Sequence, residues 1–448
     1  MMETVRIDLK NTKGVIKPMH AVNNGPAGSR VRGVKGNFEA YKALEIPYAR
    51  NHDASFYSGY GGEHTVDVHR IFKNFDADVE DPASYVFAPT DAYVADTFEA
   101  GTEVFYRLGA SIEHGHKMGT YPPKDFLKWA QICEHIIRHY TEGWANGFHY
   151  DIKYWEIWNE ADCRNADGSN PCWQGSEEQF IDFYCTVAKH LKECFPHLKI
   201  GGPAFAIRHA TEFSNKFLTR VREENIPLDF FSYHAYAKHP DEIYHATFER
   251  EKELADHGLG GTETILNEYN YIKGWLGDEW RYSLKAERSL QGASFVAGCM
   301  CACQESPLGM LMYYDARPSG MNGMFDQYTL EPLKGYYTFK MFSELYRLGT
   351  GIETGHRTGD IYHTAATDGK NAACLLTNYP NDESDTAEEQ VKIEFTGAPQ
   401  GAKKVEYYLL DEDHDCTLLS EEIFTSDTFA VYRNFPLHAT YLIKITAL

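Results

Sequence analysis

The chain has 448 residues, 43% of them hydrophobic and 14% aromatic, which is enough for a large core and for more than one average domain. Lysine and arginine together number 43 against 65 acidic residues, giving a formal net charge of −22. A surface this acidic repels phosphate backbones and anionic lipid. We therefore expect neither nucleic acid nor a membrane as a partner.

The chain shows no targeting or membrane-spanning pattern. Its first residues, MMETVRIDLK, contain no basic segment followed by an apolar run, and nowhere do about 18 uncharged apolar residues run together. We expect a cytoplasmic protein whose ten cysteines stay reduced. Cys299, Cys301 and Cys303 lie in an apolar stretch without a CxxC partner, so we expect buried core thiols rather than metal ligands.

Short apolar runs alternate with helical patterns from about residue 13 to residue 348. The runs are KPMHAV, IPYARNHD, TEVFYRLGAS, YWEIWNE, KIGGPA, DFFSYHAY, ETILNEYN and GMLMYYDAR. Most of them lack polar alternation, which is typical of strands buried on both faces. Strands alternating with helices indicate parallel βαβ units. Eight such units predict a (β/α)8 barrel, with a large open sheet as the alternative.

Two of the intervening helices carry clear local signals. After Pro122 and Pro123, apolar residues recur at helical spacing as far as Tyr140, and proline is well tolerated at a helix start. Ser176 and Gln179 form a capping-box pattern ahead of a second amphipathic helix.

After Gly349 the pattern changes to strict alternation of apolar and polar residues. The segments 391–395 and 441–445 alternate in this way, and turn-rich pieces separate them. We predict that residues 349–448 form an antiparallel β-sandwich. Residues 1–12 alternate as well and are expected to add a strand to it, which leaves residues 13–348 as the barrel.

Two of the predicted strands end in the same pair, Asn-Glu. YWEIWNEAD ends its apolar run at Asn159 and Glu160, and ETILNEYN does so at Asn267 and Glu268. In a parallel barrel the C-terminal strand ends lie on the same, active-site face. Two opposed carboxylates there are the minimum set for glycoside hydrolysis, because one protonates the leaving oxygen and the other attacks the anomeric carbon. One Asn-Glu alone is better explained as a helix cap or a turn, so the pair carries the prediction.

Neighbouring strand ends supply further polar groups. Asn159 is expected to hydrogen-bond a sugar hydroxyl, and the aromatic rings beside Glu160 are expected to raise the pKa of its carboxyl, as a general acid requires. His234 and Tyr236 end the strand FFSYHAY, and both are assigned to substrate binding. We expect the Tyr236 phenol to donate to Glu268 and to keep it ionised.

Loop residues at the same face are assigned with alternatives left open. His52 and Asp53 follow the second predicted strand and are assigned to substrate binding, with a structural hydrogen-bond network as the alternative. Trp275 is assigned to stacking on a sugar ring, with packing as the alternative for it and for Trp173 and Trp280.

A metal-dependent hydrolase is the weaker chemical alternative. Six histidines supply imidazole near the predicted strand ends: His52, His64, His69, His114, His116 and His234. No HxH or HExxH motif ends a strand in the spacing of a metalloenzyme, so we expect no metal and no cofactor. Asp315 and Arg317 end the eighth strand, where a salt bridge that closes the barrel is favoured slightly over substrate contact.

The segment WEIWNEAD resembles the acid/base motif of glycoside hydrolase family 39, the β-xylosidase and α-L-iduronidase family. Its Glu-x-Trp-Asn-Glu-x-Asp core is matched at Glu156, Trp158, Asn159, Glu160 and Asp162. NEYN resembles the family's nucleophile strand end and FFSYHAY its sixth strand. The chain departs from the family at Trp155, Ala161 and Asn267, where Phe, Pro and Thr respectively are commoner. The resemblance covers roughly residues 13–348, and a C-terminal β-sandwich also fits the family.

The resemblance implies a retaining, exo-acting glycosidase with Glu160 as general acid/base, Glu268 as nucleophile and no cofactor. Xylosides in short oligosaccharides are the first expectation for the substrate. The alternatives are another glycosidase of the same clan (an arabinofuranosidase, a β-galactosidase or an iduronidase-like enzyme) and a non-catalytic carbohydrate-binding protein. A non-catalytic carbohydrate-binding protein has no need for two opposed acids. The sequence leaves the sugar, the linkage and the oligomeric state open.

Overall fold

The computed structural model describes residues 2–27, 36–54, 64–113, 116–381 and 388–448. In these ranges, no helix combines the length and the apolar character that crossing a membrane requires. His114, one of the histidines considered as a metal ligand, lies outside the described residues.

Eight parallel strands close into a barrel, with the last strand paired to the first. In ring order they are β3 (Ala21–Asn23), β4 (Tyr48–Arg50), β5 (Glu103–Leu108), β6 (Tyr154–Ile157), β7 (Lys199–Phe205), β8 (Phe230–Ala237), β9 (Glu263–Tyr271) and β10 (Met310–Tyr313). Each predicted apolar run overlaps one of these strands. The predicted barrel is therefore confirmed, and the open-sheet alternative is wrong.

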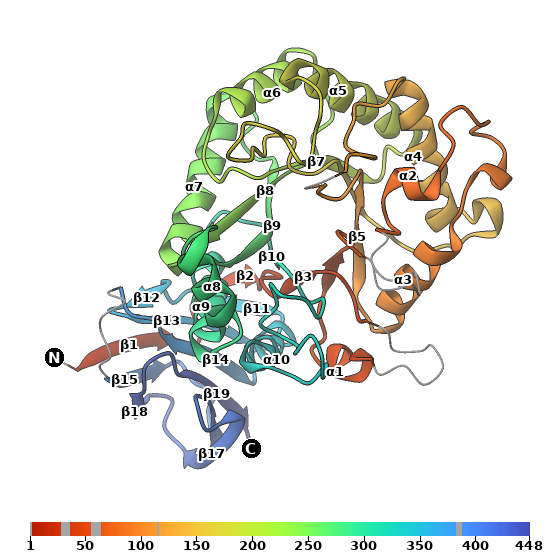
Figure 1. Cartoon of the computed structure of the whole chain (residues 1–448). Coiled ribbons are helices and arrows are strands. Elements are labelled where there is room, and N and C mark those ends of the chain that lie inside the picture. Colours follow the sequence, from red (N-terminus) through yellow and green to blue (C-terminus); the bar gives the residue numbers. More distant parts are fainter. Residues whose placement is uncertain (1, 28–35, 55–63, 114–115, 382–387) are drawn as a thin grey trace.

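Helices surround the barrel on its outer side (Figure 1). They are α1 (Phe38–Lys42), α2 (Val68–Ile71), α3 (Ala88–Glu99), α4 (Phe126–Thr141), α5 (Glu177–Cys194), α6 (Glu212–Glu223), α7 (Pro240–Asp256), α8 (Gly277–Glu287), α9 (Leu290–Gln304) and α10 (Lys334–Tyr346), with single 3-10 turns η2 (Pro82–Ser84) and η3 (Trp144–Asn146). The capping box of Ser176 and Gln179 at the start of α5 is confirmed. The two prolines lie ahead of α4 rather than in its first turn, because Asp125 is its N-cap and accepts from Lys128 N–H.

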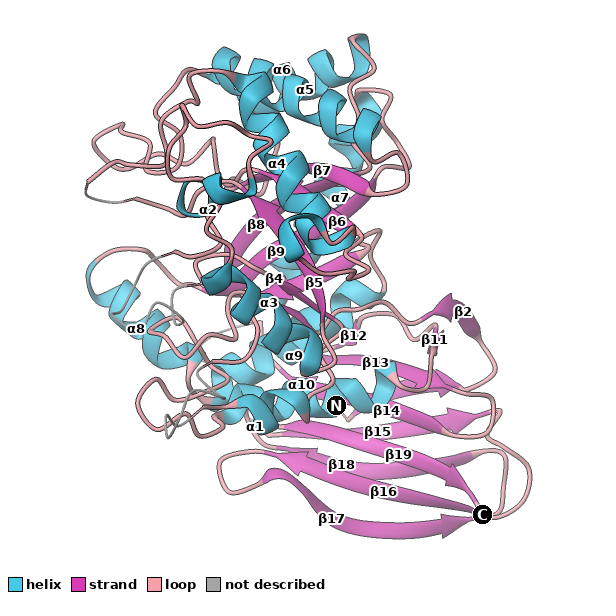
Figure 2. Cartoon of the chain, turned by 90° about the vertical axis from the view of Figure 1, so that its right-hand side faces the viewer, coloured by secondary structure: helices cyan, strands magenta, loops and turns pink. Residues whose placement is uncertain are grey.

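The C-terminal part forms two stacked sheets, seen below the barrel in Figure 2. One sheet contains β1 (Glu3–Asp8), β15 (Glu389–Thr396) and β18 (Phe429–Phe435). The other contains β2 (Thr12–Val15), β11 (Thr350–Ile352), β12 (Arg357–Thr358), β13 (Ile361–Thr367), β14 (Ala372–Asn378), β16 (Lys403–Leu410), β17 (Asp415–Phe424) and β19 (Thr440–Ala447). The N-terminal strand β1 pairs with β15 in parallel, so this sheet is not wholly antiparallel. The strand β2 pairs with β11 before the chain enters the barrel.

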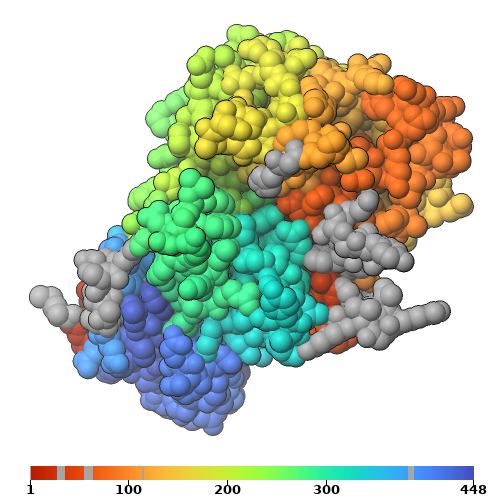
Figure 3. Space-filling model, viewed as in Figure 1, coloured from red at the N-terminus to blue at the C-terminus, as the bar shows by residue number. Residues whose placement is uncertain are grey.

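Helix α9 lies between the barrel and the sandwich and joins them. It is buried along nearly its whole length, as expected of a helix that is apolar all round. Ser294 hydrogen-bonds Thr377 and the carbonyl of Asn378 in the sandwich. Figure 3 shows the blue atoms of the C-terminal strands directly against the green and teal atoms of residues near 300. The cysteines of α9, at positions 299, 301 and 303, are buried and free, which confirms the prediction of core thiols.

Candidate active site

Alternate residues of β8 face the barrel interior and become polar toward the C-terminal end. Phe230 packs in an apolar cluster with Ile265 and Met310 inside the barrel. Two residues later, Ser232 donates to the buried carboxylate of Glu156, at 2.6 Å. Because successive side chains of a strand alternate between its faces, the next two inward positions of β8 reach the strand end. There the candidate catalytic groups lie.

Arg50, the last residue of β4, connects four polar side chains inside the barrel. Its Nε donates to Glu156 at 2.6 Å and its Nη1 to Glu268 Oε1 at 2.7 Å. The same guanidinium donates to Asn23 at 3.1 Å and to Asn159 Oδ1 at 2.6 Å. Arg50 is fully buried, and a buried cation is tolerated only with such partners. The network holds Glu268 and Asn159 in fixed orientations.

Glu160 and Glu268 meet at His234. The ring Nδ1 lies 2.8 Å from Glu160 Oε1 and 3.4 Å from Glu268 Oε2. One oxygen of each carboxylate and this nitrogen all lie within 4.8 Å of one another. Tyr236 donates to Glu268 Oε2 at 2.8 Å, the contact expected from the sequence. The structure thus brings together two acids that are 108 positions apart in the chain, from 160 to 268.

Burial dominates the electrostatics of this centre. Burial raises the pKa of Glu268 to about 7, the nearby Glu160 adds to the rise, and the His234, Arg50 and Tyr236 contacts oppose it. The donors expected around Glu268 are present, but desolvation outweighs them. Burial lowers the pKa of His234 to about 4, so its imidazole is neutral at pH 7.

His52 and Asp53 lie beside Glu268 in a second polar cluster. Arg107 Nε donates to His52 Nδ1 at 3.1 Å, so the other ring nitrogen, Nε2, carries the proton of the neutral ring. That Nε2 lies 3.5 Å from Asp53 Oδ1 and 3.6 Å from Glu268 Oε1. Tyr314 donates to Asp53 Oδ2 at 2.8 Å.

Polar and charged neighbours decide the ionisation of Asp53. Burial opposes the charge, but the nearby His52 ring, the Arg317 guanidinium and the Tyr314 hydroxyl hold the pKa of Asp53 well below its usual range. Arg317 also pairs with Asp315 at 3.0 Å and donates to the Asp53 carbonyl. Asp53 Oδ1 accepts no hydrogen bond from the residues that the structure describes.

The three tryptophans considered for stacking have different environments. Trp173 is buried and packs edge-to-face on Trp158, so it belongs to the core. Trp275 is 53% exposed and lies edge-to-face on Tyr236, with ring centroids 5.0 Å apart. Trp280 stacks on Trp275, with ring centroids 5.6 Å apart. A cavity of about 250 Å³ is lined by Tyr236 and Trp275 together with residues 237–238 and 272–274.

Three non-glycine residues of the site have left-handed backbone conformations. Trp158 has φ +72°, Glu160 φ +47° and Asp53 φ +55°. Such conformations cost free energy and persist only where surrounding contacts fix them. The N–H groups of Trp158 and Glu160 donate to the carbonyls of Leu108 and Ala204 on the neighbouring strands. These contacts fix the turn that presents Glu160.

Three groups of described side chains have the composition and spacing of metal ligands. They are Glu160, His234 and Glu268; Glu160, Cys163 and Cys172; and Glu134, His190 and Cys194. Of the five described histidines considered from the sequence, only His234 belongs to any of these groups.

Sequence reasoning gave no role to several side chains that shape this centre. The sequence did contain a signal for Arg50 and Glu156. Each is a charged residue at the end of, or inside, an apolar run predicted to be a buried strand, and a buried charge requires a partner. Cys172 had none: its thiol lies 3.7 Å from Glu160 Oε2 because the loop after β6 folds back. Tyr314, the phenol that donates to Asp53, is brought near only by closure of the barrel.

Comparisons with known proteins find similarity to glycoside hydrolases. The model of "Glycosyl hydrolases family 39" matches residues 60–267, a range that includes Glu160 and ends one residue before Glu268. A beta-xylosidase of Geobacillus stearothermophilus is 31% identical over 137 residues, which are 30% of this chain and 25% of that enzyme's length. The chain thus matches only about a quarter of this curated relative.

Two solved structures share the fold over the whole chain. A glucosidase from Croceicoccus marinus superposes with a TM-score of 0.81 at 20% identity and full coverage of both chains. A GH39 enzyme from Xanthomonas axonopodis pv. citri gives 0.72 at 13% identity, covering 100% of this chain and 98% of that one. The family model and the curated relative match part of the chain, and the solved structures share the fold of all of it. Residues 60–267 are therefore similar to glycoside hydrolase family 39.

Proposed function

We propose that this protein is a retaining glycoside hydrolase in which Glu268 is the nucleophile and Glu160 the general acid/base. The observation that carries the proposal is the meeting of the two carboxylates at the C-terminal end of the barrel, with oxygens within 4.8 Å. Retaining glycosidases keep their two carboxyl groups about 5–5.5 Å apart, whereas inverting enzymes separate them by about 6.5–9.5 Å. The short separation favours retention.

The proposed reaction is a double displacement. In the first step Glu268 attacks the anomeric carbon while Glu160 gives its proton to the departing oxygen, and a glycosyl-enzyme ester forms. In the second step Glu160 takes a proton from water, which attacks the same carbon and releases Glu268. The sugar leaves with its original anomeric configuration.

The surrounding side chains support these roles. Arg50 and Tyr236 each donate to one oxygen of Glu268, at 2.7 and 2.8 Å, and stabilise the carboxylate that leaves in the second step. Neutral His234 holds Glu160 and Glu268 near each other. Asn159, fixed by Arg50, is proposed to bind a hydroxyl of the sugar under attack.

For the substrate we propose a neutral β-glycoside, with short β-xylosides first. The beta-xylosidase similarity supports xylosides. The ionised Asp53 favours a neutral sugar, because a uronate carboxylate there would meet like charge. We propose that His52 and Asp53 bind hydroxyls of the same sugar and that the exposed Trp275 stacks on the leaving group. The full-length similarity to a glucosidase makes a β-glucoside the second candidate.

The test is a comparison of three carboxylate variants on aryl glycosides. Glu268→Ala should lose turnover on every substrate by at least about 10³-fold, because no ester can form. Glu160→Ala should lose about 10²–10⁴-fold on substrates with poor leaving groups and much less on activated ones, since these depart without a proton. The matched control is Glu263→Gln, at the opposite end of β9, where the side chain contacts Tyr154.

Two results would contradict the assignment. One is unchanged hydrolysis of an activated aryl glycoside by Glu268→Ala, and the other is a product of inverted configuration. A panel of aryl xyloside, glucoside, galactoside and arabinofuranoside separates the substrate proposals.

A further inference from the structure

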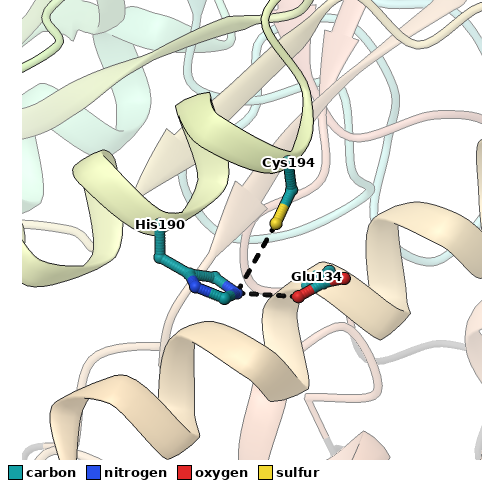
Figure 4. A group of neighbouring side chains, drawn as sticks. All are labelled: Glu134, His190 and Cys194. Carbon is teal, nitrogen blue, oxygen red and sulfur yellow. Dashed lines mark hydrogen bonds and ion pairs between the residues drawn. The ribbon is translucent and has the colours of Figure 1, made fainter.

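A cluster of three potential metal ligands lies on the outer helices, away from the catalytic strand ends. Glu134 belongs to α4, and His190 and Cys194 lie one turn apart on α5. His190 Nε2 is 2.7 Å from Glu134 Oε2 and 3.8 Å from Cys194 Sγ. All three atoms lie within 4.8 Å of one another. Figure 4 shows the three side chains pointing toward one another across the two helices.

The pattern of contacts distinguishes a metal site from a catalytic triad. A thiol nucleophile needs a histidine that contacts the thiol with one ring nitrogen and the carboxylate with the other. Here both contacts are made by the same atom, His190 Nε2. Three donor atoms that converge on one point are the arrangement of ligands around an ion. An ion pair between Glu134 and His190 would explain the positions of those two side chains but not the position of Cys194.

The donor set selects the class of ion. One oxygen, one nitrogen and one sulfur suit zinc and disfavour magnesium or calcium, which require oxygen. Tetrahedral zinc, with bonds of about 2.0–2.3 Å, needs ligand separations of roughly 3.3–3.6 Å. The observed separations of 2.7 and 3.8 Å lie on either side of that range, so small side-chain shifts suffice.

The neighbourhood of the cluster supports an ion. Arg138 Nε donates to the other oxygen of Glu134, at 2.9 Å, which orients the carboxylate and leaves Oε2 toward His190. The side chains of Glu134 and His190 are 16% and 18% exposed, so an ion can reach them from solvent. A carboxylate and a thiolate together neutralise a divalent charge.

We propose that Glu134, His190 and Cys194 form a zinc site, with water as the fourth ligand, that fastens α4 to α5. Because α5 follows the loop that carries Glu160, the ion stabilises the helix behind the acid/base strand without entering the reaction. Zinc binds the thiolate form of cysteine, so binding at Cys194 would release a proton.

The test uses the full chain, kept reduced and stripped of metal by a chelator. Cobalt(II), a spectroscopic substitute for zinc, should bind at one equivalent and give a thiolate-to-cobalt absorption band. Added zinc should displace it and raise the melting temperature. Cys194→Ser should lose the band, and His190→Gln should bind at least about 10-fold more weakly. Both side chains are partly exposed, and circular dichroism checks that the variants stay folded.

The cysteines beside Glu160 provide the matched control. Cys163 and Cys172 form the competing thiol group, so Cys172→Ser should keep both the band and the one equivalent of cobalt. The proposal is overturned if wild type binds no stoichiometric cobalt, or if the band persists in Cys194→Ser and disappears in Cys172→Ser. Neither result depends on catalytic activity, so the zinc site and the proposed glycosidase function are tested separately.

Discussion

At the residue scale, two acids and a tyrosine define the centre. Glu160 and Glu268 follow Asn in each of two strands, and this repetition is what made them visible in the sequence. Their protonation is set by their surroundings, because burial raises the pKa of Glu268 to about 7 against the donors around it. The hydroxyl of Tyr236 is one of those donors, at 2.8 Å, and its loss has a predictable effect.

Replacing Tyr236 by Phe should move the acid limb of the kcat/KM profile to higher pH. Glu268, the proposed nucleophile, would react as a carboxylate, so activity should be lost as pH falls through its pKa. Removing a donor to the charged form raises that pKa further. A hydrogen bond to a charged group contributes about 1.5–3 kcal/mol, or roughly 1–2 pH units. The pKa of the acid limb is an apparent value of the two coupled carboxyl groups. Its shift is measured from the pH dependence of kcat/KM on an activated aryl glycoside.

The control for this shift is Tyr233→Phe on the same strand. The Tyr233 hydroxyl is buried and has no hydrogen-bond partner among the described residues. Its removal should leave the limb in place. A limb that stays fixed, or moves to lower pH, in Tyr236→Phe would contradict the role assigned to the phenol.

At the scale of elements, local sequence signals placed strands and helices well. The apolar sequence runs that lack alternating polar residues form the strands of the closed barrel. Such strands are buried on both faces, because helices cover the outer one. The capping box before α5 is formed as predicted, with Ser176 and Gln179 hydrogen-bonded in both directions. The start of α4 was predicted too early, since the proline pair precedes a loop and Asp125 makes the cap.

Substituting Ser176 by Ala should destabilise the protein by about 1 kcal/mol, because the N–H of Gln179 loses its acceptor at the helix start. The measurement is the free energy of unfolding from urea denaturation. Ser176→Thr is the control, since threonine also caps helices, and it should recover most of the loss. Equal destabilisation by Ala and Thr would point to packing rather than capping.

At the scale of the whole molecule, the barrel and the sandwich share one interface. Helix α9 is apolar on every side and is covered by the barrel on one side and by β13 and β14 on the other. Its Cys301 thiol contacts the carbonyl of Leu375 in β14. A helix of this kind requires cover on both sides.

A fragment of residues 16–348 should therefore be insoluble or should bind a hydrophobic dye, because removing the sandwich exposes α9. Soluble yield and dye fluorescence are the measurements. As a control, deletion of only the edge strand β17, most of whose residues are exposed, should leave the chain soluble. A soluble fragment with the activity of the full chain would contradict this prediction, because it would show that the barrel folds without the sandwich packed on α9.

The sequence by itself determined the barrel, the sandwich and the two strand-end acids, because periodicity and repeated motifs are local properties of the chain. Only the tertiary structure decided how these acids are held. Arg50 lies in β4, Glu156 in β6 and Glu268 in β9, while Asn159 follows the end of β6. These side chains meet only once the barrel has closed. The loop that brings Cys172 to Glu160, and the facing of α4 and α5 that gathers Glu134, His190 and Cys194, likewise depend on long-range packing. Contacts between distant segments are set by that packing, which no local pattern encodes.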